Sequence, residues 1–286
     1  MSPGAAPAYR LRAMGQGDIP DGLRLCRAAG WNQRDEDWRL LLTLNPGRFV
    51  AAVSDGGRVI GTGGAACYGR DLAWVCMILV DPSERGQGLG TRITQAVLER
   101  LGDMARIGLD ATPKGQSIYA RLGFAETGRL VRMEAEGAAR AAPAEPTATP
   151  LAAGDLEAVL AMDREVFGAD RGGVVRWAFA QGPAWCIREG GRITGYCFGR
   201  AGERYRQIGP VVAASVEQAR RLVEAALTSG AGRVVVDAAA ERGDWVSALA
   251  SLGFREERPL IRMYHAGARA AGRPERQLAI FGPEFG

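Results

Sequence analysis

The chain has 286 residues, and this length predicts two domains of ordinary size. Hydrophobic residues make up 47% and charged residues 24%, a balance typical of a soluble globular protein. The formal net charge of +4 comes almost entirely from arginines interleaved with acids, so no basic tail or stripe predicts nucleic-acid binding.

Segments that direct a chain to a membrane or out of the cell are not predicted. No window is apolar enough to span a bilayer, and the first residues lack the basic and apolar regions of a signal peptide. The cysteines form no C-x-x-C pair, which indicates reduced residues in a cytoplasmic protein, and a single histidine, His265, makes a metal site unexpected. The cysteines are Cys26, Cys67, Cys76, Cys186 and Cys197.

The first 70 residues predict short strands and helices that follow one another along the chain. Asp18 is suited to begin a helix, and the turn Gly56-Gly57 between two apolar runs predicts a β-hairpin. The expected strands cover residues 9–13, 49–53 and 59–67, and the expected helices cover residues 18–29 and the segment of Trp38, Leu41 and Leu42.

The stretch from Leu72 to Leu101 predicts a strand, a glycine-rich turn and a helix. The strand is the unbroken apolar run 72–80, and the helix carries apolar residues at steps of four. Glycines stand between them at positions 86, 88 and 90, next to Arg85. Because the first amides of a helix have no partner within it, and glycines leave them accessible, the turn is suited to hold a phosphate.

The spacing of this turn narrows the kind of phosphate ligand. A P-loop ends in Gly-Lys-Ser/Thr and a dinucleotide turn has the spacing G-x-G-x-x-G, and neither is present. Arg85, Gly88 and Gly90 fit the pattern Q/R-x-x-G-x-G/A after a strand. The turn therefore resembles the pyrophosphate loop of the GNAT superfamily of acyl-CoA N-acetyltransferases. The alternative is a glycine-rich turn without a ligand.

A second motif follows at the distance that the GNAT family has. Residues 107–112 predict a short strand, and the segment after it carries Tyr119, Gly123 and Phe124. These residues match Y-x-x-x-G-F on the helix that follows in the family. With both motifs in order, the resemblance covers roughly residues 50–135.

The second half of the chain repeats the first. Residues 136–150, rich in Ala, Pro, Thr and Gly, predict a linker between the copies. The matching segments are Gly56–Gly61 with Gly190–Gly195, Leu122–Phe124 with Leu252–Phe254, and Leu130–Met133 with Leu260–Met263, the last two at one offset of 130 residues.

Together with this repeat, the resemblance implies a catalytic GNAT domain over residues 1–135 and a second GNAT-like domain with a C-terminal tail over residues 151–286. The expected fold class is α/β of the α+β type, with tandem GNAT folds that each have a mixed, largely antiparallel central sheet flanked by helices. The second copy is predicted to be degenerate, because no glycines follow its strand near Gly209 and Leu249 stands where the first copy has Tyr119. The apolar end of the tail predicts that it docks onto a domain.

The resemblance implies acetyl-CoA as the co-substrate and assigns residues to it. The strand end is implied to pair with the pantetheine arm, and Tyr119 to act as the general acid toward the thiolate; the alternative is a packed tyrosine on an amphipathic helix. The implied coenzyme residues are Ile78, Leu79, Val80, Arg85, Gly86, Gln87, Gly88, Leu89, Gly90 and Thr91.

The general base and the acceptor side are less defined. The strand 72–80 has no Glu, so Asp110 is a candidate for the base or for the anchor of a cationic substrate, and an ordered water is the alternative. His265 is expected to be non-catalytic because it lies in the copy without a coenzyme loop. On the acceptor side the candidates are Trp31, Asn32, Gln33 and Trp38 and, from the second copy, Asp163, Glu165, Phe167, Asp170 and Arg171; the alternatives are a core tryptophan, a solvated loop and an exposed amphipathic helix.

The resulting hypothesis is an acetyl-CoA-dependent N-acetyltransferase with one active site and a small-molecule amine as acceptor. We expect no metal, no nucleic-acid or membrane partner, and a monomer or homodimer. The rival hypotheses are a non-catalytic acyl-CoA-binding or regulatory protein and a scaffold with two GNAT-like folds.

Overall fold

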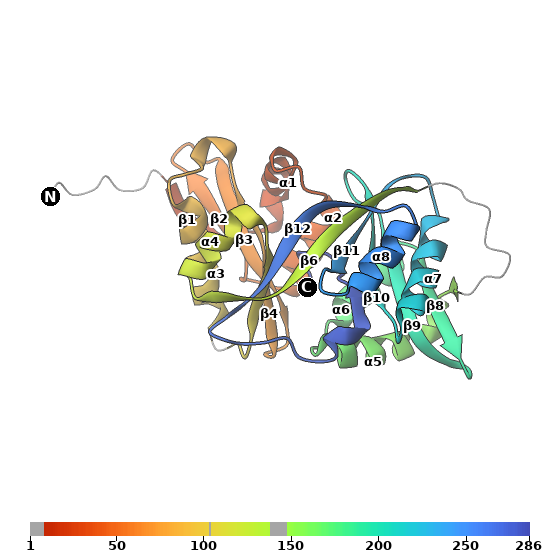
Figure 1. Ribbon diagram of the computed structural model, residues 1–286. Helices are drawn as coiled ribbons and strands as arrows, with labels where there is room; N and C mark the ends of the chain where they lie inside the picture. The colour runs from red at the N-terminus through yellow and green to blue at the C-terminus, as the bar shows by residue number, and fades with distance from the viewer. Residues whose placement is uncertain (1–8, 103, 138–147) are drawn as a thin grey trace. The chain divides into compact units, whose positions relative to one another are not determined.

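The computed structural model describes residues 9–102, 104–137 and 148–286 (Figure 1). The contacts between residues divide the chain into two compact units, Met1–Ala105 and Arg106–Gly286. In the described part of the chain no helix combines the length and the apolar composition needed to cross a membrane. The five cysteines are free thiols, four of them buried.

The first unit contains a four-stranded antiparallel sheet in the order β1-β2-β3-β4. The expected hairpin at Gly56-Gly57 joins β2 and β3. Gly64 on β3 leaves room for the ring of Phe49, because a Cβ there would lie 2.1 Å from the ring. The elements are β1 (Tyr9–Ala13), α1 (Ile19–Ala28), α2 (Asp35–Leu44), β2 (Val50–Ser54), β3 (Val59–Tyr68), β4 (Leu72–Val80) and α3 (Leu89–Leu101), with short 3-10 turns at Gln16–Asp18 and Pro82–Glu84.

The second unit contains the strands in the order β5-β12-β6-β11-β13-β10-β9-β8-β7. Its pairings are antiparallel except for a short parallel contact of β10 with β11. The strands are β5 (Ile107–Ala111), β6 (Phe124–Gly137), β7 (Thr149–Pro150), β8 (Ala184–Glu189), β9 (Arg192–Arg200), β10 (Arg206–Val212), β11 (Gly232–Ala239), β12 (Arg255–His265) and β13 (Gln277–Ala279). The helices are α4 (Pro113–Arg121), α5 (Leu156–Phe167), α6 (Gly172–Gln181), α7 (Val216–Leu227) and α8 (Gly243–Ser251), with 3-10 turns at Ala153–Asp155 and Pro274–Arg276.

The last strands of the two copies are exchanged. β6, from the first copy, pairs with β11 of the second, and β12, from the second copy, pairs with β5 of the first. Between them β6 and β12 run antiparallel, with Leu130 opposite Leu260, the same position of the repeat (Figure 1). Because of this exchange the contacts group β5, α4 and β6 with the second copy. The domain boundaries expected at residues 135 and 150 follow the repeat and stay predictions, and residues 138–147 of the expected linker lie outside the described residues.

Two equivalent ion pairs join the exchanged strands. Arg262 on β12 lies opposite Asp110 on β5, and its Nε and Nη2 donate to both carboxylate oxygens at 2.9 and 2.8 Å. Arg132 on β6 lies opposite Asp237 on β11 and makes the same two bonds at 2.7 and 2.8 Å. Each pair links an aspartate of one copy to an arginine of the other, so the two pairs stabilise the exchanged arrangement of strands.

The C-terminal tail docks onto the second copy, as its apolar sequence predicts. β13 lies between β10 and β11 and pairs antiparallel with both. Beyond it, Phe281 and Phe285 are 2% and 0% exposed. Glu284 accepts a hydrogen bond from buried Arg200 at 2.8 Å, so the tail contributes both apolar and ionic contacts to the core of this copy.

Candidate functional site

The glycine-rich turn of the first unit connects β4 to α3. Its first residue, Asp81, is 5% exposed and accepts hydrogen bonds from Arg24 at 2.7 Å, from Arg58 at 2.5 Å, and from the backbone and hydroxyl groups of Ser83. Burial acts to raise the pKa of Asp81, but the hydrogen bonds from Arg24 and Ser83 and the charge of Arg58 outweigh burial and lower this pKa to about 2. The start of the turn is therefore fixed by a charged, hydrogen-bonded anchor.

Residues 85–88 in the middle of the turn are exposed. Gly86 and Gly88 both have φ of +80°, which favours glycine, and a Cβ at either would meet nothing within 4 Å. The first hydrogen bond of α3 runs from Arg92 N to Gly88 O at 3.1 Å. The amides of residues 89–91 therefore precede the hydrogen-bonded part of the helix, at the positive end of its dipole. The open space beside Gly86 and Gly88 would admit a phosphate group next to this end of the helix.

A β-bulge in β4 was not predicted from the sequence. Thr62 of β3 pairs with Leu79, whereas Gly64 pairs with Cys76, so β4 has one residue more than its partner here. Within the bulge Met77 has φ of +58°, and its carbonyl accepts a hydrogen bond from the hydroxyl of buried Thr62 at 3.0 Å. A bulge leaves backbone groups outside the ladder of the sheet. In β4 it lies next to residues 78–80, where the coenzyme arm is expected to pair.

The acceptor-side candidates of the first unit lie between α1 and α2. Asn32 and Gln33 are 4% and 8% exposed, while Trp31 is half-buried. Trp38 is fully buried on α2 and packs edge-to-face against Phe49, which confirms the alternative that it is a core residue. Among the described residues the buried Oε1 of Gln33 has no hydrogen-bond partner. This segment is therefore an ordered, mostly buried loop rather than a solvated one.

Tyr119 lies on α4 of the second unit, half-buried and in contact with its own motif. Its ring packs edge-to-face against Phe124 at 6.0 Å between centroids, and Phe124 packs in the same way against His265 at 5.1 Å. The backbone N–H of Ala266 donates to the carbonyl of Gly123 at 3.1 Å. His265 belongs to the second copy by sequence, but the exchange of β12 brings it to the Tyr119 motif, a proximity that the sequence did not predict.

Asp110 is held by Arg262 rather than free. Its side chain is 0% exposed, and both of its oxygens accept from the one guanidinium. Burial raises the pKa of Asp110, while the charge and hydrogen bonds of Arg262 oppose this rise. The equivalent pair Asp237–Arg132 has its aspartate in the second copy, which has no glycine loop, so the arrangement favours a structural role for Asp110. Its assignment as a base stays a prediction.

The candidates of the second copy differ in burial. Asp170 is exposed and pairs with Arg164 at 2.6 Å, and a hydrogen bond from the backbone of Gly172 lowers its pKa. Asp163 and Arg171 are instead 1% and 2% exposed and form a bidentate ion pair, with the guanidinium 3.8 Å from the centroid of Phe167. These three side chains are part of the core, whereas Asp170 and Glu165 lie on the surface in ion pairs with Arg164 and Arg273.

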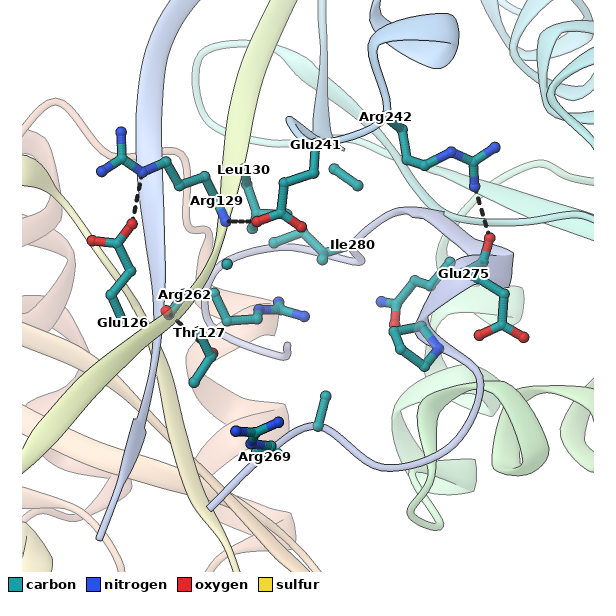
Figure 2. A pocket seen from close by; sticks show the side chains of 15 residues that line it. Glu126, Thr127, Arg129, Leu130, Glu241, Arg242, Arg262, Arg269, Glu275 and Ile280 are labelled. Atoms are coloured by element: carbon teal, nitrogen blue, oxygen red, sulfur yellow. Dashed lines mark hydrogen bonds and ion pairs between the residues drawn. The ribbon is translucent and has the colours of Figure 1, made fainter. Parts of the chain in front are cut away.

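The second unit also contains a cavity of about 640 Å³ (Figure 2). It is lined by the start of β6, the end of β11, the turn before α8, Arg262 of β12 and several residues between positions 269 and 280. In Figure 2 the Arg262 guanidinium reaches into the middle of the ring of side chains, with Glu241 on one side and Arg269 on the other. The volume of the cavity is in the range of small-molecule sites. In the described ranges no group of three or more His, Cys, Asp or Glu is placed to hold a metal ion.

The predicted site residues thus fall into two groups. The implied coenzyme residues, with Trp31 and Asn32, belong to the first unit, and Tyr119, Asp110 and Asp170 belong to the second. Sequence reasoning missed the bulge at Met77, the cavity and the proximity of His265 to the motif of Tyr119. The cavity is lined by residues that are distant in the sequence. The pairing of the exchanged strands, which the sequence did not predict, brings several of them together.

Comparisons with known proteins agree with this architecture. The Acetyltransferase (GNAT) domain matches residues 45–126 and again residues 159–282. The uncharacterized N-acetyltransferase YitH of Bacillus subtilis is 25% identical over 250 residues, which cover 86% of this chain and 88% of that protein.

Solved structures share the fold over nearly the whole chain. A putative acetyltransferase from Pyrococcus horikoshii has a TM-score of 0.82 at 19% identity, covering 100% of this chain and 99% of that one. A tandem GNAT protein from the clavulanic acid biosynthesis pathway has a TM-score of 0.63 at 17% identity, covering 91% and 99%. The chain belongs to the GNAT acetyltransferase family, as an enzyme with two GNAT domains in tandem.

Proposed function

We propose that this enzyme transfers the acetyl group of acetyl-CoA to the primary amine of a small molecule, at one active site that uses the glycine loop of the first copy. The single observation that carries this proposal is the turn between β4 and α3. It combines an anchored start, two glycines with φ of +80° and helix-start amides that precede the first hydrogen bond of α3. The second copy has no such turn.

The residues of the first unit fit the parts of the coenzyme. The amides of residues 85–91 would hold its pyrophosphate, assisted by the dipole of α3. The strand end at residues 78–80 would pair with the pantetheine arm. The bulge at Met77 supports this role. It takes backbone groups of β4 out of the sheet ladder, next to the place where the arm would bind and a backbone donor would polarise the thioester carbonyl.

Acetyl-CoA supplies a thioester whose carbonyl carbon the amine attacks. As the C–N bond forms and the C–S bond breaks, the amine nitrogen loses a proton to a base or water. The departing thiolate takes a proton, for which the phenol of Tyr119 is our candidate donor. Binding both reactants on one protein makes the step effectively unimolecular.

The test is native mass spectrometry with acetyl-CoA, followed by release of coenzyme A thiol with a panel of primary amines. We expect one bound acetyl-CoA per chain and turnover with at least one amine. Binding without turnover across the panel would favour the non-catalytic acyl-CoA-binding protein, and no binding would favour the scaffold.

Tyr119→Phe tests the assignment of the general acid. We expect unchanged acetyl-CoA binding and a fall in kcat of about 100-fold, within the range that a positioned proton donor contributes. Tyr9→Phe, on β1 of the first unit, is the control that removes a phenol elsewhere. An unchanged kcat in Tyr119→Phe would assign the proton transfer to another group.

A further inference from the structure

Most charges around the cavity of the second unit are neutralised by an ionic partner. These pairs place arginine and carboxylate groups within 3.2 Å of one another. They are Arg129–Glu126, Arg242–Asp244, Arg262–Asp110 and Glu275–Arg273.

Two lining side chains remain without an ionic partner among the described residues. Arg269 is exposed and forms no hydrogen bond or ion pair there, and Glu241 accepts only the backbone N–H of Arg129, at 3.2 Å. Figure 2 shows them on opposite sides of the Arg262 guanidinium. The cavity therefore presents to the same space one cation and one carboxylate that form no ion pair, although the charge of Glu241 also acts on Arg129, and a ligand that carries both charges would complement it.

The repeat provides an internal comparison for Arg262. Its counterpart Arg132 makes the same bidentate pair with an aspartate, but Tyr205 covers it with a hydrogen bond at 2.5 Å and its side chain is only 5% exposed. The Arg262 side chain is 17% exposed and lines the cavity. One of the two pairs is thus closed within the core, whereas the other borders a space of ligand size. A guanidinium fixed by an aspartate is preorganised to bind a carboxylate.

We propose that this cavity binds a small molecule that carries both an ammonium and a carboxylate group, as amino acids and their ω-amino relatives do. Arg269 and Arg262 contact the carboxylate, and Glu241 contacts the ammonium. The binding of this ligand to the second unit does not depend on the proposed function.

The first experiment measures binding without coenzyme. Isothermal titration calorimetry compares 6-aminohexanoate, which has both groups, with hexylamine and hexanoate, which have one each. We expect 6-aminohexanoate to bind about tenfold more tightly than either, since one charge-assisted contact at a partly exposed site is of that order. Equal affinities for the three probes, or no binding of any, would overturn the proposal.

Variants assign the two ends of the ligand. Arg269→Ala is expected to remove the advantage of 6-aminohexanoate over hexylamine, and Glu241→Gln its advantage over hexanoate. Arg255→Ala is the control, because Arg255 is an exposed arginine on β12 outside the cavity. Loss of affinity in all three variants alike, or in none, would contradict the assignment.

Arg262→Lys and Arg132→Lys form a matched pair. Each keeps the charge and breaks one bidentate contact with an aspartate, so both are expected to lower the melting temperature. Only Arg262→Lys is expected to weaken the binding of 6-aminohexanoate. If Arg132→Lys weakens it equally, the effect of Arg262 is on the fold and its role in binding is refuted.

Acetyl-CoA binding separates this proposal from the proposed function. We expect Arg269→Ala and Glu241→Gln to bind acetyl-CoA as the parent chain does, because neither residue belongs to the glycine-rich turn. Loss of acetyl-CoA affinity together with loss of 6-aminohexanoate affinity would show that the substitutions disturb the fold and would overturn the assignment.

Discussion

Gly88 and Gly57 share a backbone conformation but lie at different places in the first unit. Both have φ of +80° and open space around a would-be Cβ, but Gly57 lies in the hairpin turn between β2 and β3 and Gly88 immediately before α3. We expect Gly88→Glu to abolish acetyl-CoA binding, because it puts a like charge beside the pyrophosphate. Gly57→Glu carries the same backbone strain, about 1 kcal/mol, and is expected to leave binding unchanged.

Isothermal titration calorimetry with acetyl-CoA measures this difference, and the melting temperature shows the shared strain. An equal loss of affinity in both variants would mean that strain, not the coenzyme contact, causes the effect. Unchanged affinity in Gly88→Glu would remove the turn from the binding site.

Asp81 makes the stability of the turn depend on pH. Its pKa in the folded protein is about 2, below the ordinary value of 3.8, so its ion pairs stabilise the fold fully above pH 3.8 and are lost as the pH falls toward about 2. Asp81→Asn should remove this part of the acid dependence and lower stability at pH 7 by about 1 to 2 kcal/mol. Urea unfolding at pH 7 and pH 3 measures both effects. Asp55→Asn, an exposed aspartate in the hairpin, should change neither; if it matches Asp81→Asn, the anchor is not the cause.

Local patterns along the chain were predictable from the sequence, but pairings between strands that are distant in the sequence were not. The strand 72–80, the turn at Gly86–Gly88 and the helix of Tyr119 follow from residues within one stretch. The bulge at Met77 depends on the count of residues in β3, its partner. The exchange of β6 and β12 depends on which of two similar segments, 130–133 or 260–263, lies beside Asp110, and their shared sequence cannot decide this.

In the second copy the C-terminal tail lies beside β10, the strand that corresponds to β4. β10 follows β9 as β4 follows β3, and it has the same extra residue, because Ile208 pairs with Gly199 and Val211 with Cys197. This bulge contains Pro210, which has no N–H. A Cβ on Gly209 would lie only 2.0 Å from the carbonyl oxygen of Ile280, and β13 lies between β10 and β11. The chain itself therefore occupies the space beside the bulge.

From this occupancy we expect one acetyl-CoA per chain even at saturating concentration. Gly209→Ala should displace the tail and lower stability by about 1 to 3 kcal/mol, as overpacking does. Hydrogen exchange of residues 277–285 should then increase, while coenzyme stoichiometry stays at one. Gly243→Ala, with open space around the added methyl, is the control. Two bound coenzymes in native mass spectra, in the parent chain or in Gly209→Ala, would contradict this account of the second copy.

Within the second unit, the exchange of strands joins segments of both copies into one sheet. β6 lies between β12 and β11, and the ion pairs Arg262–Asp110 and Arg132–Asp237 cross from copy to copy. Each copy therefore has a strand that pairs with the other copy. Two fragments, residues 1–140 and 145–286, should therefore be insoluble when expressed separately and should copurify when expressed together.

The buried ion pairs give this prediction a specific test. Asp110→Arg places like charges side by side in a buried position, which costs about 3 to 5 kcal/mol, and should abolish copurification of the fragments. Adding Arg262→Asp restores opposite charges and should recover part of the complex, a coupling that two independent substitutions do not show. Asp244→Arg on the surface of α8 is the control and should leave copurification unchanged. Soluble, folded fragments that do not bind each other would mean that each copy closes its own sheet. The exchange of β6 and β12 would then be dispensable for folding.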